Sequence, residues 1–148
     1  DILKSFEKNE AVIVRNPDST RPWQHVLEPL SGYLMLAQNL YNNTEQYSEG
    51  WNFGPTENNV KPVEYIVETI TSLWPGSSWK KDYDLHPHEA GFLKLDISKA
   101  KELLGWTPTW DLSITLKSII RWHKLWLDGA DMRKVCTTEI NNFIKEMN

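Results

Sequence analysis

The chain has 148 residues, of which 40% are hydrophobic and 24% charged, so it is long enough to bury one core. Eight prolines and seven glycines are too few for a disordered or collagen-like chain. The net charge of −4 argues against a nucleic-acid or anionic-membrane binder, because such proteins present a clustered basic face. No apolar run approaches the roughly 20 residues that a membrane helix needs.

The first residue is Asp1 rather than Met, and no targeting segment follows it, so we expect the chain to be a piece of a longer protein. A lone cysteine, Cys136, cannot form an internal disulfide, which fits a reducing cytoplasm. We therefore expect a cytoplasmic protein.

The first half of the chain predicts short strands that alternate with amphipathic helices. The clearest helix has a broad apolar stripe that includes Val26, Leu30 and Tyr33. In chain order we expect a helix over 1–8, a strand over 11–14, a helix over 26–41, a strand over 50–55 and a helix over 61–73.

The second half is richer in helix and has clear end signals. Asp96 and Asp111 are good N-caps, and Gly105 is suited to end a helix in the left-handed conformation. These signals predict a helix-rich mixed α/β fold. The expected elements are a strand over 78–83, an extended segment over 91–95, and helices over 97–104, 111–127 and from 131 onward.

Arg21 is the first candidate for chemistry, because it stands at the predicted mouth of the 26–41 helix. A guanidinium there would join the helix N–H groups in binding an anion such as phosphate, with Ser19, Thr20 and Gln24 adding neutral hydrogen bonds. In the alternative interpretation, Arg21 pairs with a local carboxylate and Trp23 packs under the loop. The residues alone leave both open.

His86, His88 and Glu89 form a second candidate cluster, in a loop stiffened by Pro87. Three such groups without a further partner motif are weak evidence for a metal, and we expect none. The chain has no glycine-rich dinucleotide turn, no triphosphate loop and no hydrolase nucleophile elbow. Its eight tryptophans either line a sugar or nucleotide pocket or fill the core and an interface.

Several motifs together resemble the extended short-chain dehydrogenase/reductases that act on nucleotide sugars. They are Arg-Pro-Trp-Gln-His-Val at 21–26, Asn-Phe-Gly-Pro at 52–55, Leu-Lys-Leu-Asp at 93–96, Ser-Lys-Ala at 98–100 and Leu-Gly-Trp-Thr-Pro at 104–108. The likeness runs in order over essentially the whole chain. It implies that residues 1–148 form the nucleotide-sugar-binding carboxy-terminal domain, in which about 25–54 would flank a dinucleotide-binding sheet that is otherwise missing.

The resemblance also implies roles for individual residues. Arg21 matches the arginine that contacts the diphosphate, and Val14 and Arg15 match positions beside the base. His86 stands where many relatives have a second phosphate-binding arginine, and Leu93 where some have tyrosine. Because neutral histidine carries no charge, His86 is the weaker match.

The implied activity is the dehydration of CDP-glucose, with NAD as cofactor. Relatives carry the NAD-binding turn and the catalytic groups in their amino-terminal part, so this chain is expected to bind substrate, hold no cofactor and turn nothing over. A homodimer is expected. Two alternatives stay open: a free-standing sugar- or nucleotide-binding module, and a purely structural dimerisation domain.

Overall fold

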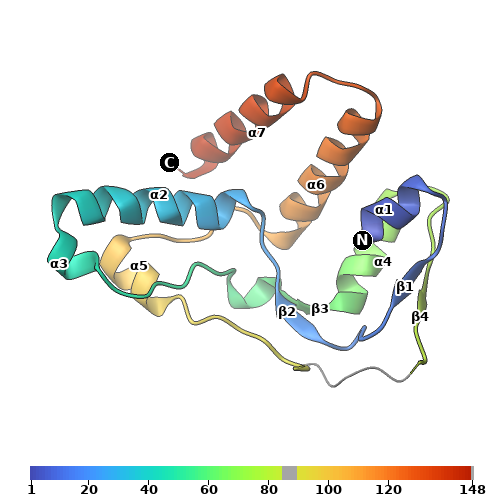
Figure 1. Ribbon diagram of the computed structural model, residues 1–148, viewed down its shortest axis with the longest axis horizontal. Coiled ribbons are helices and arrows are strands. Elements are labelled where there is room, and N and C mark those ends of the chain that lie inside the picture. The colour runs from blue at the N-terminus through green and yellow to red at the C-terminus, as the bar shows by residue number, and fades with distance from the viewer. Residues whose placement is uncertain (85–89, 148) are drawn as a thin grey trace.

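The computed structural model describes residues 1–84 and 90–147, and its helices far outweigh its strands. Figure 1 shows helices α6 and α7 as a hairpin beside the long helix α2, with the strands gathered near α1 and α4. The elements are α1 (Ile2–Glu7), β1 (Val12–Val14), β2 (Thr20–Pro22), α2 (Leu27–Asn42), α3 (Thr44–Tyr47), the 3₁₀ turn Glu57–Asn59, β3 (Val60–Pro62), α4 (Val63–Leu73), β4 (Trp79–Lys81), α5 (Ser98–Leu104), α6 (Leu112–Leu127) and α7 (Met132–Met147).

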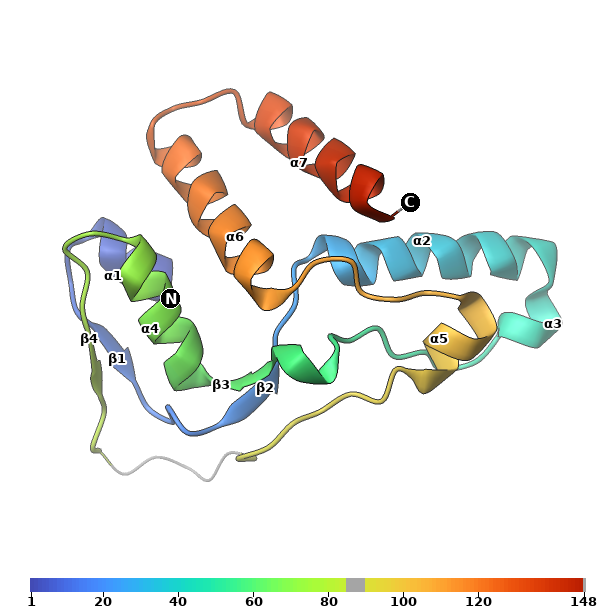
Figure 2. The same cartoon turned by 180° about the vertical axis from the view of Figure 1, so that it is seen from behind.

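The strands form two small sheets of two strands each within the described part of the chain. β1 and β4 are parallel, with Val14 in register with Lys81, and β2 and β3 are antiparallel, with Arg21 in register with Lys61. The reverse view in Figure 2 shows both sheets on the same side of the molecule as α4. The turn that leads from β1 to β2 therefore lies between the two sheets.

The larger hydrophobic core joins α1, β1, α4 and α6. Val12 and Val14 face this core, whereas Ile13, between them, is 59% exposed, as strand alternation requires. The buried members are Phe6, Val12, Val14, Ile66, Val67, Ile70, Leu112, Leu116 and Ile120.

A smaller core lies between α2 and α5 and is built on Phe53, Ile97, Ala100 and Trp106. The indole N–H of Trp106 donates to the Ser31 hydroxyl at 3.0 Å, which fixes the ring against α2. Trp106 and Trp110 are 1% and 4% exposed, so these two tryptophans are core residues.

Glu28, in the first turn of α2, fastens this helix to the chain before α6. Its side chain is fully buried, and its two carboxylate oxygens accept hydrogen bonds from the backbone N–H groups of Thr109, at 2.9 Å, and Trp110, at 2.7 Å. Burial raises the pKa of the Glu28 carboxyl, and the two backbone hydrogen bonds partly oppose that rise. The contact holds two segments together that are more than 80 residues apart in the sequence.

Two of the helix-end signals in the sequence are confirmed. Asp111 caps α6 by accepting from the Ile114 N–H at 2.7 Å, and Gly105 ends α5 at φ 68°. The prediction that Asp96 is an N-cap is wrong: α5 begins at Ser98 with Ile97 as its N-cap, and Asp96 accepts from the Ser98 N–H at 2.9 Å from one residue further out. The strand predicted over 50–55 is wrong: its residues are irregular, because Trp51 and Phe53 pack against α2 and α5 with no strand beside them. The helix-rich α/β class is confirmed.

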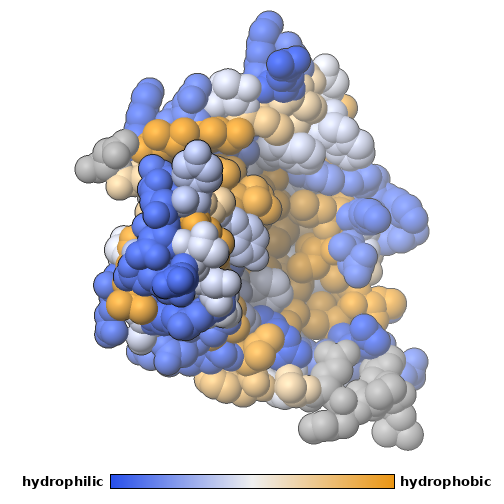
Figure 3. Space-filling model, turned by 60° about the vertical axis from the view of Figure 1, so that its left-hand side comes forward, coloured by the Kyte–Doolittle hydropathy of each residue, from blue (hydrophilic) through white to orange (hydrophobic). Residues whose placement is uncertain are grey.

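Helix α2 keeps one apolar face in contact with solvent. Leu34 on this face is 74% exposed. Figure 3, in which the left-hand side of Figure 1 comes forward, shows apolar side chains gathered in a hollow of the surface. No helix of the described residues is both long and apolar enough to cross a membrane. The other strongly exposed apolar side chains on or next to α2 are Val26, Leu30, Tyr33 and Tyr41.

Candidate functional site

A hollow of about 260 Å³ lies between β1, β2 and α4, and it contains three of the residues expected at the site: Val14, Arg15 and Arg21. These residues meet because β1 and β2 are joined by a short turn, which carries them around one opening. The full lining is Asp1, Ile2, Val12, Ile13, Val14, Arg15, Asn16, Ser19, Arg21, Trp23, Val63 and Val67.

Arg21 lies within strand β2, so the prediction that it stands at the mouth of a helix is wrong. Helix α2 begins at Leu27, whose backbone N–H donates to Nδ1 of His25 at 3.3 Å. Residues 22–24 separate the guanidinium from the start of this helix. The side chain of His25 already accepts a hydrogen bond from the first N–H group there. The positive charge of Arg21 therefore acts without help from a helix dipole.

The Arg21 guanidinium is held in place by backbone carbonyls. Its Nη1 donates to the carbonyl oxygens of Thr20, at 2.9 Å, and Ala90, at 2.8 Å. Thr20 also forms a parallel bridge to Phe92. These two carbonyl contacts orient the guanidinium fork.

Trp23 gives the hollow an apolar wall. Its indole N–H donates to the Lys61 carbonyl oxygen at 2.8 Å, which satisfies its one polar atom and fixes the ring. Val14 and Val63 add aliphatic surface, and Ser19, which is 7% exposed, adds a hydroxyl. The hollow thus combines a flat aromatic ring and aliphatic walls with guanidinium groups at its rim, which are the features that a nucleotide requires.

Two expected site residues, Gln24 and Leu93, do not line this hollow. Gln24 donates through Nε2 to the Phe53 carbonyl oxygen at 2.8 Å and so faces the smaller core. Leu93 is 48% exposed and joins β2 through its backbone, donating to the Thr20 carbonyl oxygen at 3.1 Å. His86, with His88 and Glu89, lies outside the described residues.

Sequence reasoning missed Lys81, which is in register with Val14, a residue that lines the hollow. Its ammonium lies 3.3 Å from the carboxylate of Asp18, in the turn between β1 and β2. The sequence predicts strands over 11–14 and 78–83. It does not predict that they pair, because the parallel pairing of β1 with β4 is a long-range contact with no local signal. Among the described residues, no group of three His, Cys, Asp or Glu side chains is placed to hold a metal.

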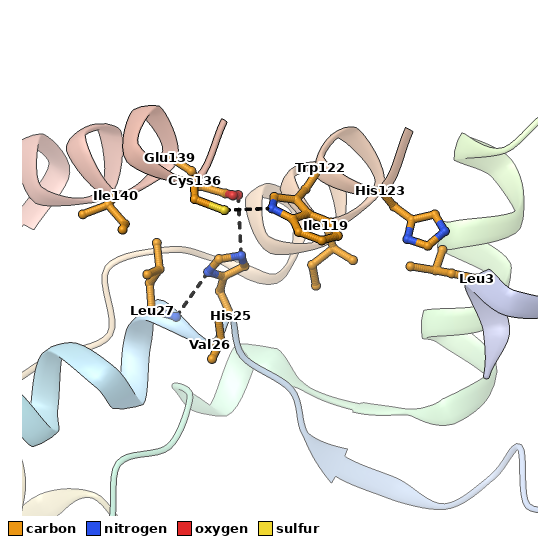
Figure 4. Close-up of a pocket in the computed structure, with 10 residues that line it drawn as sticks. All are labelled: Leu3, His25, Val26, Leu27, Ile119, Trp122, His123, Cys136, Glu139 and Ile140. Atoms are coloured by element: carbon orange, nitrogen blue, oxygen red, sulfur yellow. Dashed lines mark hydrogen bonds and ion pairs between the residues drawn. The ribbon is translucent and has the colours of Figure 1, made fainter. Parts of the chain in front are cut away.

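A larger cleft of about 470 Å³ opens between α1, α2, α6 and α7 (Figure 4). Its walls are mostly apolar, and its polar groups include His25 and Glu139, whose nearest side-chain atoms are 3.6 Å apart. Burial lowers the pKa of His25, an effect that the nearby Glu139 charge partly opposes, so the imidazole is neutral at pH 7. The described residues that line this cleft include a carboxylate and neither lysine nor arginine, so the cleft disfavours a diphosphate.

Comparison with known proteins shows the class of fold first. The structure resembles the crystal structure of UDP-N-acetylglucosamine 4-epimerase from Bacillus cereus, with a TM-score of 0.56 and 16% identity over 83% of this chain and 42% of that one. The chain thus shares its helix-rich α/β fold with part of that epimerase. No family model matches the chain.

The sequence is similar to that of a particular enzyme. It is 54% identical to CDP-glucose 4,6-dehydratase of Salmonella typhimurium over 145 residues, which are 97% of this chain and 40% of that protein. This similarity confirms the resemblance expected from the motifs, to the carboxy-terminal part of such an enzyme. The chain spans less than half the length of the relative.

Proposed function

We propose that this chain is the substrate-binding part of a CDP-glucose 4,6-dehydratase and binds CDP-glucose in the hollow between β1 and β2. The observation that carries the proposal is the meeting of Arg15, Arg21 and the Trp23 ring around one opening. Arginine recognises phosphate through its planar fork, and an aromatic ring suits a nucleobase. The similarity to the Salmonella enzyme supplies the substrate.

In the whole cytoplasmic enzyme, the glucose would be oxidised at C4, lose water across C5 and C6, and be reduced at C6, with NAD carrying the hydride. The described residues do not fit that cofactor: the two parallel strands are not joined by a glycine-rich turn into a helix, and the start of α2 is occupied by its own chain. We therefore assign NAD and the catalytic groups to the rest of the parent protein. This chain contributes binding energy that orients the sugar.

Arg21→Met should weaken CDP binding about ten-fold or more, because it removes a charge-assisted contact to phosphate. Isothermal titration with CDP, UDP and glucose measures this effect, and circular dichroism checks that the variant keeps its fold. Arg133→Met, which removes an exposed arginine of α7, is the matched control and should bind CDP normally.

The same titration separates the alternatives. Equal CDP affinity in Arg21→Met and the unmodified chain would contradict the proposed site. Binding of glucose alone would favour a free-standing sugar module, and the absence of any binding by the unmodified chain would favour a structural domain.

We also propose that the chain forms a homodimer, supported by the apolar face that α2 leaves exposed. Light scattering at high concentration should show twice the monomer mass. Leu34→Glu, on the exposed face, should shift the chain to monomer, whereas Leu103→Glu on α5 should not. A clean monomer at every concentration would contradict this proposal.

A further inference from the structure

The turn formed by residues 16–19, between β1 and β2, brings two neutral polar residues to the lining of the hollow, Asn16 and Ser19. We propose that these two residues recognise the nucleobase of the ligand by hydrogen bonds to its polar edge. The inference rests on the proposed function, since it assigns part of the same site. Both residues are then specificity-determining: they favour a base that carries hydrogen-bonding groups over an apolar ring of similar size.

Backbone hydrogen bonds fix this turn against the start of α4. The Ser19 N–H donates to the Asn16 carbonyl oxygen at 3.2 Å, which closes the turn, and the ring of Pro17 stiffens it. The Pro17 carbonyl oxygen accepts from the Glu64 N–H at 2.9 Å, one of the helix N–H groups that have no partner inside a helix. The Ser19 carbonyl oxygen accepts from the Val63 N–H at 3.0 Å. The backbone of the turn is therefore held in place before any ligand binds.

The Ser19 hydroxyl is a nearly buried polar group that the fold leaves unpaired. Ser19 is 7% exposed, and its hydroxyl forms no hydrogen bond with any other of the described residues. Unlike the unpaired hydroxyl oxygens of Thr71 and Thr115, which are fully enclosed, the Ser19 oxygen keeps some accessible surface. Buried polar groups in proteins nearly always have a hydrogen-bond partner, and a ligand in the hollow can supply one here.

The Asn16 amide is likewise unused by the fold. An Asn or Asp side chain that begins a turn commonly accepts from the backbone N–H two residues further on, as Asp96 does from Ser98 at 2.9 Å. The half-buried Asn16 side chain forms no such bond within the described part of the chain. Its amide therefore offers a donor and an acceptor side by side. Cytosine presents the complementary pair, an amino donor next to a ring-nitrogen acceptor.

The other uncharged surfaces of the hollow suit the face of a base and not its edge. The Trp23 ring is a flat wall, and Val14 and Val63 add aliphatic surface. Such walls accept every base, because every base has an apolar face. Among the described residues of the lining, Asn16 and Ser19 carry the neutral polar side chains that have no hydrogen bond, so the recognition of an edge falls to them.

The test compares two ligands that differ only in the base: CDP, and the same ribose diphosphate with a benzene ring in place of cytosine. Isothermal titration of each variant with both ligands gives the ratio of the two affinities. Asn16→Ala should lower the preference for CDP about three- to ten-fold and Ser19→Ala about two- to five-fold, because each loses neutral hydrogen bonds to the base. Asn58→Ala removes an exposed asparagine of the 3₁₀ turn and is the matched control, which should keep the ratio of the unmodified chain. Both ligands are titrated into the same sample, so partial unfolding of a variant does not change the ratio.

Two results would overturn the inference and leave the proposed function intact. If Asn16→Ala and Ser19→Ala bind both ligands as the unmodified chain does, neither residue contacts the ligand. If the two variants weaken both ligands by the same factor, the residues shape the turn and do not recognise the base. Failure of the unmodified chain to bind CDP at all is a different result, in which the proposed function fails together with the inference.

Discussion

Glu28→Ala should lower the free energy of unfolding by about 3–5 kcal/mol, the largest effect expected of any single change considered for this chain. The substitution removes both hydrogen-bond acceptors of the Thr109 and Trp110 N–H groups, and Trp110 is 4% exposed. Buried donors that lose their partner cost about 1–3 kcal/mol each, and the space left by the carboxylate adds to this cost.

Urea unfolding followed by circular dichroism measures the loss. Glu68→Ala makes the same chemical change at an exposed position of α4 and should leave the midpoint within the range of ordinary surface substitutions. Glu28→Gln should have an intermediate effect, because its amide keeps one acceptor oxygen but turns an N–H₂ group toward a backbone donor. A Glu28→Ala midpoint equal to that of Glu68→Ala would show that the carboxylate does not fasten α2.

Gly32→Ala should cost about 2–3 kcal/mol, although alanine is normally the better helix former. A β-carbon at position 32 would lie 2.7 Å from Cγ of Phe53 and closer still to the edge of the ring. The Phe53 ring cannot move away freely, because it packs edge-on against Trp106 with ring centres 5.0 Å apart. The added methyl group must therefore push α2 away from the smaller core.

A compensating change distinguishes this packing conflict from a general loss of helix stability. Gly32→Ala combined with Phe53→Leu should be less destabilised than the sum of the two single variants, because leucine vacates part of the ring's space. Gly50→Ala, where an added β-carbon meets nothing within 4 Å, is the control and should be neutral. Strict additivity of the two changes would contradict the predicted contact.

The parts of the fold that the sequence predicts well are those set by local chemistry. Asp111 and Gly105 mark helix ends because a cap acts on backbone groups within one turn, and the structure confirms both. The apolar spacing of the long helices similarly depends on neighbours three and four residues away. These signals require no knowledge of the tertiary structure.

The remaining features depend on long-range pairing. β2 and β3 were not predicted as strands: each has three residues, and Pro22 and Pro62 disfavour a strand on local grounds. The predicted position of Arg21, at the mouth of a helix, is wrong for the same reason. Its place in β2 is set by pairing with Lys61, which is distant in the sequence. Only the resemblance to a family predicts that Val14, Arg15 and Arg21 lie together. Trp23 forms a wall of the hollow because its indole N–H donates to the Lys61 carbonyl oxygen, which is again a long-range contact.

The tether between Arg21 and Ala90 joins residues 69 positions apart, and β1 pairs with a strand from a similarly distant part of the chain. Contacts of this separation close large loops, whose entropy must be lost before the contacts form. A short peptide that carries only the β1–β2 segment would therefore lack the arrangement that holds the guanidinium. During synthesis on a ribosome, that arrangement can arise only after residue 90 has emerged.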